Sequence, residues 1–253
     1  MKKRFTVRKI VMLISACVFL ISAAWLIKNV VDYYRGDRLY GELADKIFDA
    51  DFEDDVGEVD AMRKNVAGLK AAYPDVYGYI HIDGTRISFP IVKGEDNEYY
   101  LKRAYNGQFM ICGAIFADAG SADKFEDNRN TVLYGHNMLN GNMFNNVMLF
   151  LEEDVFNSKL IEIYTEDGIY TYEPFAIFKT RYDYPYFEMK FESDEDFVAF
   201  CEEMQNNSLY NKGMTFTGDD KIITLSTCTP STDVEWYGVG RYALHAKLIK
   251  VEK

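Results

Sequence analysis

"VYGYIHIDGTRISFPIV", residues 76–92, is the stretch in which the hydrophobic period of this 253-residue chain changes to two. Apolar side chains alternate along it on both sides of Asp83-Gly84. Alternation is typical of a β-strand with one buried face, and Asp-Gly is typical of a tight hairpin turn. The stretch therefore predicts two strands that pair around this turn.

Six further segments have the composition of strands. They are GAIFAD (113–118), NTVLYG (130–135), KLIEIYT (159–165), IYTYEPFAIFKT (169–180), KIITLST (221–227) and GRYALHAKLIKV (240–251). Eight strand candidates with tight turns favour a closed or nearly closed β-barrel over a doubly wound sheet. One helix, SDEDFVAFCEEMQNN (193–207), interrupts the series, with Ser193 as its N-cap and Cys201 on its apolar face. The predicted fold class is mostly β with accessory helices.

The N-terminal segment differs in composition from everything after it. Residues 1–9 hold five Lys and Arg, and residues 10–31 carry no charge except Lys28. About 22 largely apolar residues suffice to cross a bilayer, and a basic cluster keeps the preceding end in the cytoplasm. We expect a cytoplasmic tail and a single-pass signal-anchor, with the rest of the chain outside the cell membrane.

A cleaved signal peptide is the alternative, since Ser22-Ala23-Ala24 offers small residues near a cleavage point. The apolar run is longer than a typical signal peptide core and continues past these residues, which favours the uncleaved anchor. Residues 32–73 are predicted to be a helical extension, with helices at 37–48 and 56–72 around an acidic stretch. Residues 74–253 would then form the barrel domain.

Charge and cysteine content limit the classes of function. Five of the 28 Lys and Arg precede residue 10, which leaves 23 against 40 Asp and Glu and a formal charge of −17. This balance argues against nucleic acid and against a domain that lies on anionic lipid. The four cysteines have no CxxC or CxxH spacing, so neither a disulfide framework nor a metal site is predicted, and no cofactor is expected. Cys112 is interpreted as structural.

The three histidines differ in their sequence context. His81 lies on the strand face opposite Ile80 and Ile82 and is predicted to be solvated, and His245 lies in the last strand, where it would be a surface or packing residue. His136 follows an apolar strand and a glycine, and an Asn-rich loop comes after it. A histidine at the exit of a strand projects into a cleft without filling the core, so His136 is the candidate acid or base.

Cys228 also lies at the end of a strand, in ITLSTCTP (223–230). Period two places it on one face with Thr224 and Ser226, which is unusual for a core cysteine. A twelve-residue connection then leads to a strand that begins on Arg241. If the two strands are antiparallel neighbours, Cys228 and Arg241 face each other across the base of the connection, where a guanidinium can hold an oxyanion.

Three segments in this order, TVLYGHNM, TLSTCTP and GRYALHAKL, resemble the His, Cys and Arg motifs of sortases, the membrane-anchored cysteine transpeptidases of Gram-positive bacteria. The resemblance covers about residues 75–250 and includes DNEYYLKRAYNG and GAIFAD. The inserted helix and the two N-terminal helices are similar to the class B branch. A papain-like protease is less compatible, because that family places Cys before His.

The resemblance implies that the protein cleaves a C-terminal sorting signal after Thr in secreted proteins. Cys228 would attack the Thr carbonyl, His136 would protonate the departing amine, and Arg241 would steady the oxyanion. The acyl group would pass from the Cys thioester to a peptidoglycan precursor amine or a protein lysine. Substrate-binding candidates are Asn137, Ser226, Thr227 and Tyr237. Class B enzymes often take signals resembling Asn-Pro-x-Thr-Asn.

Two readings from other classes stay open at this point. An extracellular cysteine hydrolase with the same three residues would give a product that added amines do not change. A non-catalytic surface-binding barrel would contain Cys228 as an ordinary core residue. The occurrence of three motifs at strand ends is the sequence feature against the second reading.

Overall fold

The computed structural model describes residues 7–48 and 58–253, and eight strands close into a barrel in the order β1-β2-β3-β4-β7-β8-β6-β5. The strands are β1 (Val76–His81), β2 (Ser88–Lys93), β3 (Ile115–Ala117), β4 (Asn130–Tyr134), β5 (Ile161–Tyr164), β6 (Ile169–Arg181), β7 (Ile222–Cys228) and β8 (Gly240–Glu252). All neighbours pair antiparallel except β2 with β3 and β4 with β7. The barrel fold predicted from the alternating segments is confirmed.

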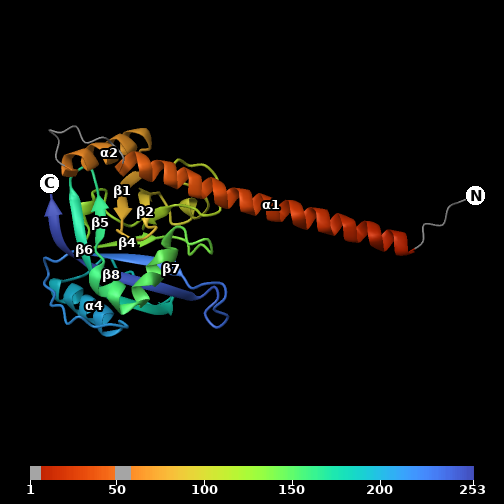
Figure 1. Cartoon of the computed structure of the whole chain (residues 1–253). Coiled ribbons are helices and arrows are strands. Elements are labelled where there is room, and N and C mark those ends of the chain that lie inside the picture. Colours follow the sequence, from red (N-terminus) through yellow and green to blue (C-terminus); the bar gives the residue numbers. More distant parts are fainter. Residues whose placement is uncertain (1–6, 49–57) are drawn as a thin grey trace, which may run out of the picture.

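Helices pack against the outside of this barrel, and α1 projects from it (Figure 1). They are α1 (Val7–Phe48), α2 (Glu58–Ala72), α3 (Glu153–Ser158) and α4 (Asp194–Asn206), with short 3-10 helices η1 (Tyr99–Lys102), η2 (Phe125–Asp127) and η3 (Phe144–Leu151). α4 lies between β6 and β7 as predicted. Ser193 is its N-cap, because the Ser193 hydroxyl accepts a hydrogen bond from the backbone amide of Asp196 at 3.1 Å. The helix predicted at 56–72 is α2, whose first two predicted residues lie outside the described residues.

The prediction of a separate helix at 37–48 is wrong, because α1 is one helix of 42 residues. No proline separates the apolar segment from residues 37–48, and a helix that has formed extends at little cost per residue. Residues 1–6 of the basic tail and most of the acidic stretch at 49–60 lie outside the described residues.

The two halves of α1 have different surroundings. An 18-residue window of its apolar part is long and apolar enough to cross a membrane, and none of it is buried within the protein. From Gly36 onward the helix packs on the barrel through Tyr40, Leu43 and Ile47. The Tyr40 hydroxyl donates to the Gly113 carbonyl at 2.7 Å, which ties this half to the loop before β3.

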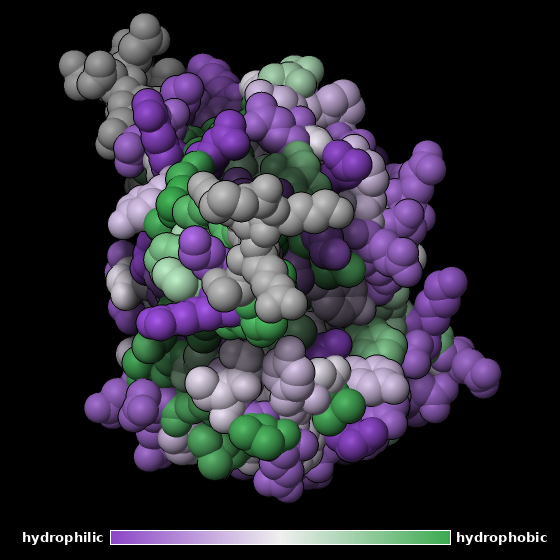
Figure 2. Space-filling view, turned by 90° about the vertical axis from the view of Figure 1, so that its right-hand side faces the viewer, coloured by the Kyte–Doolittle hydropathy of each residue, from purple (hydrophilic) through white to green (hydrophobic). Residues whose placement is uncertain are grey.

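Figure 2 shows the molecule from the side toward which α1 projects, where hydrophilic side chains line much of the rim. α1 therefore projects from a largely polar surface, and the apolar side chains of its projecting part are exposed. A protein in water normally buries an apolar surface of this size. The exposed part of α1 is therefore compatible with a membrane anchor.

Two apolar cores hold the fold together. The larger one fills the barrel and continues beneath α1 and α2, where Cys112 is buried. The smaller one lies between α4 and the strands β6, β7 and β8, and it contains Phe197, Cys201 and Met204, all fully buried. The structural roles predicted for Cys112 and Cys201 agree with these positions.

The predicted exposure of His81 is wrong. Phe48 at the end of α1 packs on its ring at a centroid distance of 4.7 Å and leaves it half-buried, with a lowered pKa because burial disfavours the charged ring. His245 is fully buried among aromatic rings, and burial lowers its pKa to about 3. Its Nδ1 is 2.9 Å from the Thr224 hydroxyl, so it is a packing residue.

Candidate active site

The parallel pairing of β4 with β7 brings the ends of the two strands together. Tyr134 lies opposite Ser226 in the register, and two residues further along the strands are His136 and Cys228. Hydrogen bonds continue past the last paired residues, since the Gly135 amide donates to the Ser226 carbonyl at 3.2 Å. The carboxyl ends of parallel strands meet at one edge of a sheet, which is why two residues 92 positions apart share a site.

Gly135 is required by the close approach at this point. A Cβ on residue 135 would lie 2.5 Å from the Ile115 side chain and 2.7 Å from the Phe144 ring. Both neighbours are fully buried, so they have little room to move. The chain therefore leaves β4 through a residue without a side chain, directly before His136.

Strand β8 places the third residue. Arg241 is the register partner of Cys228 in the antiparallel pair of β7 and β8, as the sequence predicts. His136, Cys228 and Arg241 thus follow one another across three adjacent strands at one end of the barrel. All three line one cleft of about 410 Å³.

His136 is held by a hydrogen bond from another element. Its Nε2 lies 2.7 Å from the carbonyl oxygen of Leu101 in η1. A carbonyl can only accept, so Nε2 carries the hydrogen and Nδ1 is the ring nitrogen left for proton transfer. Within the described residues no hydrogen bond to Nδ1 occurs. The ring is half-buried, in reach of solvent and of a bound substrate.

Arg241 lines the cleft, and part of its donor set is unused. One donor, Nη1, bonds the Gly240 carbonyl at 2.9 Å, and the guanidinium carbon lies 6.0 Å from the centre of the Tyr182 ring. No carboxylate within the described residues forms an ion pair with Arg241. A guanidinium in this position has donors left for a carbonyl or an oxyanion of a bound peptide.

The predicted substrate-binding residues separate into two groups. Ser226 and Thr227 line the cleft, although both are nearly fully buried, and their hydroxyls bond the Tyr186 hydroxyl and the Gly135 carbonyl at 2.8 Å. Asn137 and Tyr237 are not among the residues that line it. Asn137 donates to the Cys228 carbonyl at 2.8 Å and so joins two loops, while Tyr237 is 68% exposed on the connection before β8.

The lining of the cleft also contains a polar cluster that the sequence did not predict. The Asp118 carboxylate accepts from the Asn97 amide at 2.8 Å and from the Tyr134 hydroxyl at 3.0 Å. Burial, and then the nearby Asp118 charge, raise the pKa of Tyr134 well above its usual value, so this phenol stays a hydrogen-bond donor. Asp118 at the end of a strand was the available signal.

An aromatic part of the wall was missed as well. Tyr182, Tyr186 and Phe187 come from the segment between β6 and α4 and supply much of the apolar lining. Their signal was the aromatic run YDYPYF at 182–187. A cleft with aromatic walls and a few convergent polar groups is typical of a ligand-binding site.

We expect alkylating agents to modify Cys228 in preference to Cys112 and Cys201. The side chain of Cys228 is partly exposed in the cleft, whereas the other two are buried and burial raises the pKa of each to about 12. A raised pKa lowers the thiolate fraction at every pH below about 12, so both thiols stay slow at pH 8. Brief labelling followed by peptide mass mapping tests this, and preferential labelling of Cys201 would contradict it.

Comparison with known proteins agrees with this arrangement. The family model of the sortase domain matches residues 80–249. Sortase B of Listeria monocytogenes is 34% identical over 195 residues, which cover 76% of this chain and 76% of that protein. Sortase B of Staphylococcus aureus is 31% identical over 191 residues, which cover 75% and 77%.

Solved structures give the same result. Sortase B from Bacillus anthracis has 34% identity and a TM-score of 0.71, and the match covers 87% of this chain and 99% of that one. A Staphylococcus aureus sortase B-substrate complex has 26% identity and a TM-score of 0.74, with 87% and 99% covered. This chain belongs to the sortase family, in its class B branch. It is accordingly a cysteine transpeptidase, and neither a plain hydrolase nor a binding barrel has support.

Proposed function

We propose that this transpeptidase uses Cys228 as nucleophile, His136 as general acid and base, and Arg241 as oxyanion partner. The observation that carries the proposal is their register, in which the ends of β4, β7 and the start of β8 bring the three side chains to one cleft. A nucleophile, a proton carrier and a donor for the oxyanion are the three parts that enzymes commonly use for acyl transfer.

In the first half of the reaction, the proton of the Cys228 thiol passes to His136 Nδ1, and the resulting thiolate attacks the carbonyl carbon of the Thr in the sorting signal. The bond between carbon and sulfur forms, and the carbonyl oxygen becomes an oxyanion that accepts from the Arg241 guanidinium. The C–N bond then breaks, and the departing amine takes a proton from His136 Nδ1. The product is a thioester on Cys228 and a free C-terminal peptide.

In the second half, an acceptor amine attacks the thioester and loses its proton to His136. The C–S bond breaks, an amide forms, and the thiolate of Cys228 returns. Water gives hydrolysis by the same path. Peptidoglycan precursor or a protein lysine would supply the amine, and secreted proteins with a C-terminal sorting signal would supply the acyl group.

Among the substrate-binding candidates, Ser226 and Thr227 line the cleft, whereas Asn137 and Tyr237 have supporting positions beside it. We propose that Asn137 fixes the Cys228 end of β7 and that Tyr237 meets substrate from the exposed connection. Residues 10–31 would span the cell membrane with residues 1–9 in the cytoplasm. Residues 32–73 would then hold the catalytic barrel, 74–253, outside the cell and close to the bilayer.

The proposal predicts that added amines change the product. Peptides with a central Thr, including one of the form Asn-Pro-x-Thr-Asn, are incubated with the protein with and without an oligoglycine or diaminopimelate-containing amine. We expect a new peptide that joins the fragment ending in Thr to the amine, at the expense of the hydrolysed fragment. Mass spectrometry separates these products. If the amine does not change the hydrolysis, the protein is a hydrolase that does not transfer the acyl group to amines.

A further inference from the structure

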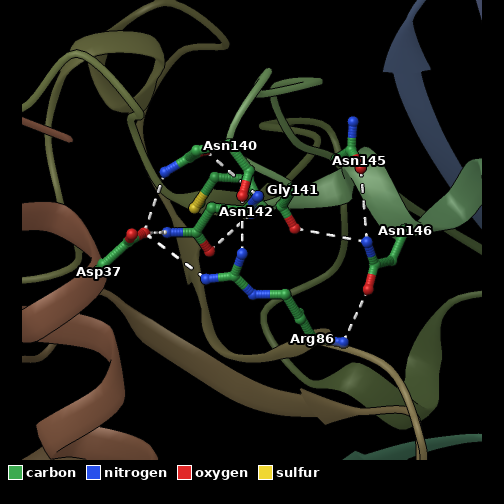
Figure 3. A network of polar contacts seen from close by, with 8 residues as sticks. Asp37, Arg86, Asn140, Gly141, Asn142, Asn145 and Asn146 are labelled. Carbon is green, nitrogen blue, oxygen red and sulfur yellow. Dashed lines mark hydrogen bonds and ion pairs between the residues drawn. The ribbon is translucent and has the colours of Figure 1, made fainter. Parts of the chain in front are cut away.

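We propose that Asp37 of α1 is a positioning residue for the loop that carries His136. The inference rests on the proposed role of His136. It goes beyond that role, because it links the helix of the membrane anchor to the active site through one carboxylate. Figure 3 shows Asp37 reaching from α1 toward the amides of this loop.

The Asp37 carboxylate is the point at which three side chains meet. Its Oδ1 accepts from the amides of Asn142 at 2.7 Å and Asn140 at 3.1 Å, and Arg86 Nη2 lies 3.9 Å away (Figure 3). Arg86, from the turn between β1 and β2, also donates to the Asn140 carbonyl at 2.7 Å. The loop after β4 is therefore fastened to two elements that are far from it in sequence.

Asn142 transmits this contact to the backbone. Its side chain donates to Asp37 and accepts from the Met143 amide at 2.8 Å, and the residue is only 5% exposed. Without Asp37, a buried amide donor would lose its partner, and such a group costs more than an ordinary hydrogen bond contributes. The loop would then have to shift in order to hydrate it.

Met143 is the strained residue of the loop. It has φ 55°, a left-handed value that L-residues rarely adopt, and within the described residues no other residue except glycine has a positive φ. A residue in such a conformation persists only when its surroundings hold it. The hydrogen bond from its backbone amide to the Asn142 side chain is part of that support, and Asp37 holds the Asn142 side chain in place.

Met143 and its neighbour connect directly to the site. Met143 forms an isolated antiparallel bridge with Asn137, and the Phe144 amide donates to the His136 carbonyl at 3.0 Å. Asn137 in turn donates to the Cys228 carbonyl at 2.8 Å. A path of contacts thus runs from α1 through Asn142 and Met143 to the backbone of both proposed catalytic residues.

The matched variants come from the same helix. Asp37→Ala removes the acceptor, and Asp37→Asn keeps an acceptor oxygen at the same place. Arg38→Ala is the control, because Arg38 is largely exposed and its ion pair is with Glu42 at 2.7 Å on the same helix. The full chain in detergent is used for turnover, for melting and for amide hydrogen exchange of the segment 136–144.

Asp37→Ala is expected to lower kcat about tenfold, because misplacing a proton carrier slows chemistry more than binding. KM should stay within about twofold. Amide hydrogen exchange in the segment 136–144 should become faster, while Tm should change little. Asp37→Asn should recover most of kcat and of the protection, and Arg38→Ala should match wild type.

Turnover and exchange in Asp37→Ala equal to those of Arg38→Ala would overturn the inference. A loss of kcat that only follows a fall in Tm, with no recovery in Asp37→Asn, would overturn it as well, because that result marks a purely structural residue. If the wild-type chain ligates no peptide, the proposed function fails. Hydrogen exchange then still decides whether Asp37 orders the loop.

Discussion

Cys228→Ala will abolish both cleavage and ligation of the sorting-signal peptide. The acyl group needs a covalent carrier, and in the part of the chain that the structure describes only this thiol lines the cleft. The steady-state rate with a quenched fluorescent peptide measures the effect, which we expect to reach the detection limit. His136→Ala should come close to the same loss.

Cys201→Ala is the control for the loss of a thiol. Cys201 is fully buried in the core beneath α4, so its replacement should lower Tm and leave turnover per folded molecule intact. Measurable ligation by Cys228→Ala would require another nucleophile and would remove the basis of the mechanism.

Arg241→Lys will reduce turnover on the order of a hundredfold or more while the fold stays intact. Lysine keeps the positive charge but not the planar set of donors that can hold the Gly240 carbonyl and an oxyanion together. The rate of peptide cleavage, with thermal melting beside it, gives the result. Turnover near that of wild type would mean that Arg241 supplies only a positive field.

Arg181→Lys is the matched control for this substitution. Arg181 lies opposite Gly240 in the pairing of β6 with β8, next to the register partner of Arg241, but its side chain is exposed and paired with Asp183 at 3.2 Å. We expect Arg181→Lys to keep the activity of wild type, because exposed ion pairs contribute little. A melted Arg241→Lys variant would instead make Arg241 a structural residue.

Local sequence patterns predicted the elements of the fold well. Alternating apolar residues and strand-like composition located all eight strands, and Ser193 with the acidic turn after it located α4. The register of Cys228 with Arg241 was also predictable, because a short connection between neighbouring strands favours antiparallel pairing. These features depend on residues close to one another in the chain.

Features that depend on distant residues were not predictable in the same way. The parallel pairing of β4 with β7 follows from barrel closure, so no local pattern indicates that His136 lies beside Cys228. The burial of His81 depends on Phe48 of α1, and the support of the His136 loop depends on Asp37, about a hundred residues before it. Asparagines at 140 and 142 mark a loop in the sequence but do not identify its partner.

The mass of the intact enzyme during turnover is the most direct test of covalent catalysis by Cys228. With a sorting-signal peptide and no amine, the account predicts an adduct whose added mass equals the fragment ending in Thr. Peptide mapping should assign the adduct to Cys228, and addition of an amine should discharge it into the ligated product. Ligation without any adduct, or an adduct on another residue, would contradict the account.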